Sequence, residues 1–173
     1  FAHEREYANM KRVSEIINYL APDALIVADP GVMMWVRVHH PDMPIHVSTQ
    51  ANICSAASVK FWQNAGASLC VLAREVPFAE FREIRAACPD VGLEIFVHGA
   101  MCMSYSGRCL LSNFITGRPA NRGACAQLCR WKYDVILRET ESGIEMPICE
   151  DDRGAYIMNS RDLCLMPRLA EII

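Results

Sequence analysis

The sequence predicts an α/β fold: a partial (β/α) barrel of the TIM type with an inserted cysteine-rich segment and a small antiparallel β meander. Four short apolar runs begin at Leu25, Ile45, Leu69 and Leu93, spaced 20, 24 and 24 residues apart. Helical patterns lie between these runs, and such strand–helix–strand repeats form right-handed crossovers in a parallel sheet. No Gly-x-Gly-x-x-Gly turn occurs, which favours a barrel over a dinucleotide-binding sheet. A smaller open sheet is the alternative.

The apolar runs are nearly continuous, as expected when both faces of a parallel sheet are covered. Phe78, Phe81 and Ile84 recur three residues apart, which is typical of a helix. Because four strands do not close a barrel, we expect a fragment truncated at both ends. The expected strands are 24–28, 45–48, 69–72 and 93–97, and the expected helices are 7–20, 32–39, 55–65 and 77–87.

The barrel repeat stops after Val97. We therefore divide the chain into a partial barrel over 1–98, a cysteine-rich insertion with the β meander over 99–165, and the start of the next barrel helix over 166–173. Long insertions after a barrel strand are uncommon unless functional, and the loops that follow barrel strands carry active sites. The expected meander strands are 131–138, 144–149 and 155–158, with turns at 141–143 and 152–154, and a final helix is expected from Leu163.

Nine of the 173 residues are cysteine, a number that is both high and odd. Their varied spacing does not match a small secreted disulfide scaffold, so we expect free thiols in a reducing, cytoplasmic compartment. Clustered thiols in such a compartment more often bind metal than pair with one another. No run of about 18 apolar residues occurs, so no membrane span is expected.

Five cysteines of the insertion are the candidate metal ligands. Four thiolates converging from loops can hold an iron–sulfur cluster or, alternatively, zinc; the remaining alternative is a set of buried, inert thiols. We expect Cys54, Cys70 and Cys88 to be core residues, and Cys164 to lie in the final helix without an assigned role. The candidate ligands are Cys102, Cys109, Cys125, Cys129 and Cys149, with Cys125 and Cys129 on one helical turn.

Charge is unevenly distributed along the chain. Residues 99–133 contain no Asp or Glu but five basic residues, whereas the rest of the chain has 12 basic and 20 acidic residues, a balance of −8. A cationic segment on an acidic body indicates an anionic partner, most commonly a phosphate. The candidate phosphate-contacting residues are Arg108, Arg118, Arg122 and Arg130, with Lys132 beside them; a solvated face or structural salt bridges are the alternative.

Polar side chains at the strand ends form a second candidate group. We expect a buried Glu94 within the fourth strand, and polar groups inside apolar strands must be satisfied. Converging at the barrel mouth, they would line a pocket; alternatively, they satisfy one another structurally. The candidate catalytic residues are His46, Gln50, Arg74, Glu94 and His98. Further along, Asn159, Ser160 and Asp162 either bind substrate or cap the final helix.

Several segments together resemble one known family. Residues 94–112, EIFVHGAMCMSYSGRCLLS, are similar to the signature of the collagenase-like peptidases of unknown catalytic type, peptidase family U32. Four shorter matches support the resemblance, which spans essentially the whole chain and is closest to the branch involved in tRNA wobble-uridine hydroxylation. They are 46–50 (HVSTQ), 73–75 (ARE), 122–131 (RGACAQLCRW) and 156–163 (YIMNSRDL).

The resemblance implies an oxygen-independent hydroxylase with a 4Fe–4S cluster, a tRNA substrate and prephenate as oxygen donor. It also implies that Arg108, Arg118, Arg122 and Arg130 are RNA-contacting residues. Cys102, Cys109 and Cys125 match the cluster ligands of the family, while Cys129 and Cys149 compete for the fourth place. The cluster would sit at the barrel mouth and activate a donor oriented by the strand-end residues. Two alternatives remain: a metal-assisted endopeptidase acting on collagen-like chains through Glu94 and His98, and a non-catalytic iron–sulfur partner subunit.

Overall fold

The computed structural model describes residues 2–133, 135–148 and 163–172. The chain divides into two compact units. Unit 1 comprises Phe1–Phe96 and Tyr105–Arg108, and unit 2 comprises Val97–Ser104 and Cys109–Ile173. The four residues Tyr105–Arg108 thus pack with the first unit, although the chain on either side of them belongs to the second.

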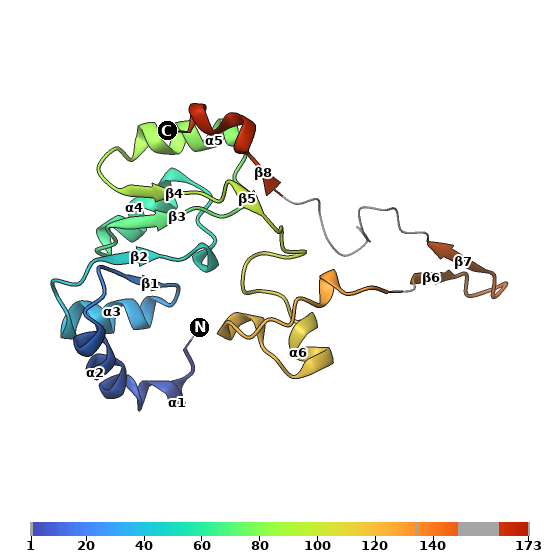
Figure 1. Ribbon diagram of the computed structural model, residues 1–173, viewed down its shortest axis with the longest axis horizontal. Coiled ribbons are helices and arrows are strands. Elements are labelled where there is room, and N and C mark those ends of the chain that lie inside the picture. The colour runs from blue at the N-terminus through green and yellow to red at the C-terminus, as the bar shows by residue number, and fades with distance from the viewer. Residues whose placement is uncertain (1, 134, 149–162, 173) are drawn as a thin grey trace. The chain divides into compact units, whose positions relative to one another are not determined.

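Unit 1 contains a four-stranded parallel sheet, which confirms the predicted α/β class (Figure 1). Neighbouring strands along the chain are neighbours in the sheet, in the order β1-β2-β3-β4. Each strand is shorter than its apolar run, and the fourth ends at Glu94 rather than Val97. The strands are β1 (Leu25–Val27), β2 (Ile45–Val47), β3 (Leu69–Val71) and β4 (Gly92–Glu94).

Helices α3, α4 and α5 connect these strands, as the sequence predicts, and two further helices precede β1. Asp29 begins α3: its carboxylate accepts hydrogen bonds from the Gly31 and Val32 N–H groups at 2.9 and 3.1 Å, and Pro30 occupies the first turn, where it needs no N–H partner. The predicted helix over 7–20 is confirmed over Met10–Leu20, whereas Tyr7 ends a separate short helix. The helical elements are α1 (Glu4–Tyr7), α2 (Met10–Leu20), α3 (Pro30–His39), η1 (Thr49–Ala51), α4 (Ala56–Asn64) and α5 (Phe78–Ala87).

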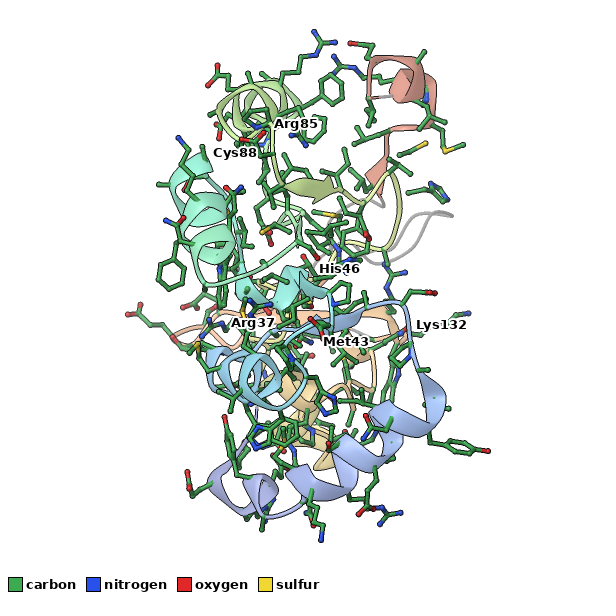
Figure 2. All side chains as sticks on the ribbon, turned by 90° about the vertical axis from the view of Figure 1, so that its left-hand side faces the viewer. Arg37, Met43, His46, Arg85, Cys88 and Lys132 are labelled. Atoms are coloured by element: carbon green, nitrogen blue, oxygen red, sulfur yellow. The ribbon has the colours of Figure 1, made fainter. Side chains whose placement is uncertain are left out.

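The two faces of the sheet differ in burial. Val27, Val47 and Cys70 pair in register and are 9%, 0% and 0% exposed, because α3, α4 and α5 pack against that face. We call the opposite face, which no helix of the core covers in the described part of the chain, the open face; it carries Ile26, His46, Leu69, Val71, Gly92 and Glu94, of which Val71 is buried. Ile26 there is 70% exposed. Figure 2 shows His46 on β2.

Two of the three cysteines predicted as core residues are buried. Cys70 and Cys88 belong to the core of unit 1, and burial raises the pKa of the Cys70 thiol to about 11, with a further contribution from Cys88. Arg85 donates to the carbonyl oxygens of Val91 and Cys88 at the end of α5 (Figure 2). The prediction for Cys54 is wrong: it is exposed, because it precedes α4 in a loop.

Unit 2 contains two small antiparallel pairs. Strands β6 and β7 form the first two strands of the predicted meander, and Gly143, at φ +70°, lies in the predicted turn between them. The predicted strand 155–158 and turn 152–154 lie outside the described residues. The strands are β5 (His98–Gly99), which pairs with β8 (Leu163–Cys164), and β6 (Val135–Arg138), which pairs with β7 (Glu145–Ile148).

The predicted final helix from Leu163 is wrong at its start. Leu163 and Cys164 form a strand, β8, that pairs with β5. A short 3-10 helix, η4 (Met166–Glu171), begins only afterwards. Long-range pairing with β5 therefore overrides the local helical pattern. The remaining elements of unit 2 are α6 (Leu111–Thr116), η2 (Ala120–Arg122) and η3 (Leu128–Arg130). Across the described ranges, no helix is long and apolar enough to cross a membrane.

Candidate functional site

The cysteine-rich insertion places four of the five predicted metal ligands in unit 2. Cys102, Cys109 and Cys129 are half-buried and Cys125 is exposed, and all four are free thiols. Cys149 lies outside the described residues. A free thiol that is neither deep in a core nor fully solvated is available to a metal or cluster.

Cys129 lies in the electrostatic field of the other thiols. Burial raises its pKa, Cys102 and Cys125 raise it further, and Arg130 and a hydrogen bond from the Met103 backbone lower it. The Cys125 sulfur in turn accepts a hydrogen bond from the Gln127 N–H at 3.3 Å. Cys102 and Cys125 are therefore near enough to Cys129 to affect its ionisation.

The donor chemistry fits an iron–sulfur cluster, since cysteine thiolates are its usual ligands. In the described part of the chain, however, no three His, Cys, Asp or Glu side chains are placed closely enough to hold one metal ion. The expectation that Cys125 and Cys129 share one helical turn is wrong. Gln127, at φ +56°, interrupts the backbone between them, and η3 starts only at Leu128.

A buried serine organises the segment that carries these cysteines. Ser112 on α6 is 1% exposed; its hydroxyl donates to the Arg118 carbonyl at 2.7 Å and accepts from the Ala126 N–H at 2.9 Å. One side chain thus fixes α6 to the backbone next to Cys125. The sequence reasoning missed this role, although a single serine inside the apolar stretch 110–115 was a signal for a buried polar group that needs partners.

The predicted RNA-contacting arginines are all exposed side chains. Arg118, Arg122 and Arg130 belong to unit 2, whereas Arg108 belongs to the segment that packs with unit 1. The four arginines of the acid-free segment therefore lie at the surface.

Among the strand-end candidates, His46 and Glu94 share the open face of the sheet. His46 pairs in register with Leu69, and Glu94 lies two residues after Gly92, the partner of Leu69 on β4. The expectation of a buried Glu94 is wrong, because the helices pack on the other face and leave this carboxylate exposed. An imidazole and a carboxylate on one open face can line a polar pocket.

The loop after β2 positions two further polar groups. Gln50 packs against Gly107, where a Cβ would lie 3.3 Å from the Gln50 amide carbon, and Gly107 adopts φ +74°. Asn52, which the sequence reasoning missed, has a buried Oδ1 with no hydrogen-bond partner among the described residues. Its φ of +55° is a conformation in which asparagine is enriched. This buried oxygen has no donor among the described residues, and a bound ligand could supply one.

Of the remaining candidates, Arg74 belongs to unit 1 and His98 to unit 2, and three others lie outside the described residues. The Arg74 guanidinium lies over the Phe96 ring, 4.5 Å from its centre, so its charge is held by a cation–π contact in unit 1. His98 belongs to β5 in unit 2 and is exposed, so the structure does not group it with His46 and Glu94. Asn159, Ser160 and Asp162 lie outside the described residues.

Comparison with known proteins gives one family and several relatives. The model of peptidase family U32 matches residues 1–173. The chain is 42% identical to tRNA hydroxylation protein P of Escherichia coli, over 83% of the chain and 40% of that relative. It is 35% identical to tRNA hydroxylation protein P1 of Bacillus subtilis, over 100% of the chain and 40% of the relative. It is 34% identical to a collagenase of Porphyromonas gingivalis, over 93% of the chain and 39% of that relative.

The chain thus spans about two fifths of the length of these relatives. None of the solved structures matches it significantly.

Proposed function

The chain belongs to peptidase family U32, and from this premise we propose that the protein containing it is an iron–sulfur-dependent hydroxylase of the tRNA wobble uridine. The observation that carries the proposal is the set of free, accessible cysteines in a segment with five basic and no acidic residues. Relatives named as tRNA hydroxylation proteins support the substrate class. A zinc site would explain the thiols but supplies no redox chemistry.

We propose Cys102, Cys109 and Cys125 as three ligands of a 4Fe–4S cluster. Cys129, which interacts electrostatically with two of them, and Cys149 are the candidates for the fourth position. When bound, the cluster would supply the redox and Lewis-acid chemistry that no protein side chain provides. Ser112 would keep the backbone beside Cys125 in place before the cluster is loaded.

The residues of unit 1 are proposed to bind the oxygen donor, for which prephenate is our candidate. This molecule carries two carboxylates and a hydroxyl group. Arg74 offers a cation to a carboxylate, while His46, Gln50 and the unpartnered Asn52 Oδ1 offer hydrogen-bonding groups. We assign these residues binding and orientation only.

We further propose that the parallel sheet is part of a closed (β/α) barrel. Parallel sheets are normally covered on both faces, yet Ile26 on the open face is 70% exposed. Further strands would bury this residue and turn the open face into a barrel interior. The polar groups at the carboxyl ends of β2 and β3 would then lie at the mouth, where barrel enzymes bind their substrates.

The proposed RNA interface consists of the exposed arginines of the acid-free segment. Arg118, Arg122 and Arg130 would contact phosphates, and each phosphate contact that forms releases counterions. Binding of tRNA to the full-length protein is therefore expected to weaken steeply with salt. Arg118→Ala should make the dependence on salt less steep, and an unchanged slope would argue against a phosphate contact there.

The function is tested in a deletion strain complemented with full-length protein. We expect mass spectrometry of tRNA nucleosides to show loss of the hydroxylated wobble uridine on deletion and its recovery with the wild-type gene. Cys102→Ser and Cys125→Ser should fail to restore it and should lose iron, whereas Cys54→Ser, an exposed cysteine outside the segment, should behave as wild type. Parallel Cys129→Ser and Cys149→Ser variants identify the fourth ligand.

Anaerobic purification of the full-length protein tests the cluster directly. A full-length protein without iron and without absorbance at about 400 nm, the region of iron–sulfur charge-transfer bands, would overturn the cluster proposal. Hydroxylation that persists in the deletion strain would overturn the catalytic role and leave that of a partner subunit.

The second candidate function is a metal-assisted endopeptidase, which the relative named as a collagenase favours. It requires Glu94 or His98 as proton acceptor for an attacking water. These two residues belong to different units of the chain. Cleavage of denatured collagen that is abolished by Glu94→Gln or His98→Ala would support this function; cleavage that survives both substitutions would remove their role.

A further inference from the structure

The helix α6 of unit 2 presents unusually exposed apolar side chains. Phe114 is 88% exposed and Leu110, one helical turn before it, is 78% exposed. The same short helix buries Ser112 instead of its phenylalanine. The aromatic ring at position 114 therefore contributes little to the core of unit 2 within the described residues, and its face is open to a binding partner.

The segment that carries this ring is cationic in sequence. Residues 99–133 include no acidic residue, and the exposed Arg118 and Arg122 follow Phe114 by four and eight positions. An aromatic ring in a positively charged, acid-free segment complements a nucleic acid, whose bases stack on aromatic faces while its phosphates pair with arginine. A base-paired duplex would not use this ring, because its bases are stacked on one another and leave no face free.

A membrane surface would also attract apolar and basic residues. Binding in the plane of a membrane interface uses a helix with a broad apolar face and many basic residues on the other face. Helix α6 has only six residues, Leu111–Thr116, and no charged residue within it. These features favour a single stacked base over a lipid surface.

We propose that Phe114 is a base-stacking residue that receives an unpaired nucleotide of a single-stranded RNA loop, with Arg118 pairing to a neighbouring phosphate. This inference rests on the proposed function, because an anticodon loop is such a substrate. It adds a recognition element outside the cysteines and the strand-end pocket. Stacking tolerates different bases, so Phe114 contributes affinity and placement of the loop rather than base identity.

The test is the binding of a synthetic anticodon stem–loop to the full-length protein. Phe114→Leu keeps an apolar side chain but removes the ring, and it should weaken binding by roughly 5- to 150-fold, the usual loss for one stacked base. Phe114→Trp should bind within about threefold of wild type because it retains a stacking face. Leu110→Ala, an equally exposed apolar truncation, and Asn113→Ala, an exposed polar one on the same helix, are the matched controls and should bind as wild type.

The outcomes separate the inference from the function on which it rests. If wild type binds the stem–loop and Phe114→Leu binds equally well, stacking is refuted and the hydroxylase proposal stands. Equal losses in Phe114→Leu and Leu110→Ala would indicate a general apolar contact and would also refute stacking. If wild type binds no RNA, both proposals fail. Co-sedimentation with anionic phospholipid vesicles that depends on Phe114, without RNA binding, would assign the surface to a membrane instead.

Discussion

Replacing Ser112 with alanine tests whether one buried hydroxyl organises the cysteine-rich segment. The substitution removes the hydrogen bond donated to the Arg118 carbonyl and the one accepted from the Ala126 N–H, at 2.7 and 2.9 Å. Ser112 is 1% exposed, so water cannot readily replace the hydroxyl. Two lost hydrogen bonds and an N–H left without its acceptor cost about 2 kcal/mol.

Hydrogen–deuterium exchange of the full-length protein measures this cost locally. A loss of about 2 kcal/mol corresponds to roughly 30-fold faster exchange in peptides that contain Ala126, provided exchange reports local opening. Peptides from β1 to β3 in unit 1 should exchange at wild-type rates. Asn113→Ala, at an exposed position on the same helix, is the control and should leave all rates unchanged.

Two results would refute the reasoning. Exchange at Ala126 within about threefold of wild type would mean that the hydroxyl contributes less than a single net hydrogen bond. Equal acceleration in Ser112→Ala and Asn113→Ala would mean that α6 is merely sensitive to substitution. The iron content of Ser112→Ala, measured on the same preparation, shows whether the disturbed backbone also impairs loading of the cysteines.

Three further predictions concern unit 1. Iodoacetamide should label the exposed Cys54 faster than the buried Cys70 in the native state. Burial raises the pKa of Cys70 from 9.0 to about 11 on folding, so the folded state keeps the thiol proton where the unfolded state loses it. The free energy of unfolding should therefore fall as pH rises from 9 towards 11, and Cys70→Ala should abolish this fall in urea unfolding measured over that pH range. Asp29→Ala should lower the free energy of unfolding by about 1 kcal/mol, because α3 loses its cap. Asp29→Asn can still cap the helix and should unfold with nearly the wild-type free energy. Equal losses in the two variants would contradict a capping role. Gly66→Ala should destabilise by more than about 1 kcal/mol, because its φ is +103° and a Cβ would lie 2.9 Å from the Arg37 Nε; Gly143→Ala, also at positive φ but in open space, should cost less in the same thermal unfolding assay.

The sequence predicted the elements of unit 1 well because their signals are local. Each strand of the sheet lies almost entirely within one apolar run. Helices α4 and α5 lie within their predicted segments, and α3 begins two residues before its own. The burial of individual strand residues was harder to predict. Glu94 was expected to be buried because the surrounding strand is apolar, but burial depends on which face receives the helices, and that is set by tertiary packing.

Unit 2 was predicted less completely because its order depends on contacts between distant residues. The pairing of His98 with Cys164 joins residues 66 positions apart, and no local pattern distinguishes such a strand from the start of a helix. Ser112 illustrates the same limit, since its two partners lie 6 and 14 residues away. The cysteines were identifiable by residue type and number, whereas their relative placement depends on these connections.

The open face of the sheet has an evolutionary consequence. His46 lies there in register between Ile26 and Leu69, a position where an aliphatic side chain would pack with its neighbours and require no hydrogen-bond partner. If His46 binds a ligand, His46→Leu should therefore yield a more stable but inactive protein. In that case selection for activity keeps the imidazole, although selection for stability alone would remove it. A lineage that no longer needs the activity would therefore lose His46 early.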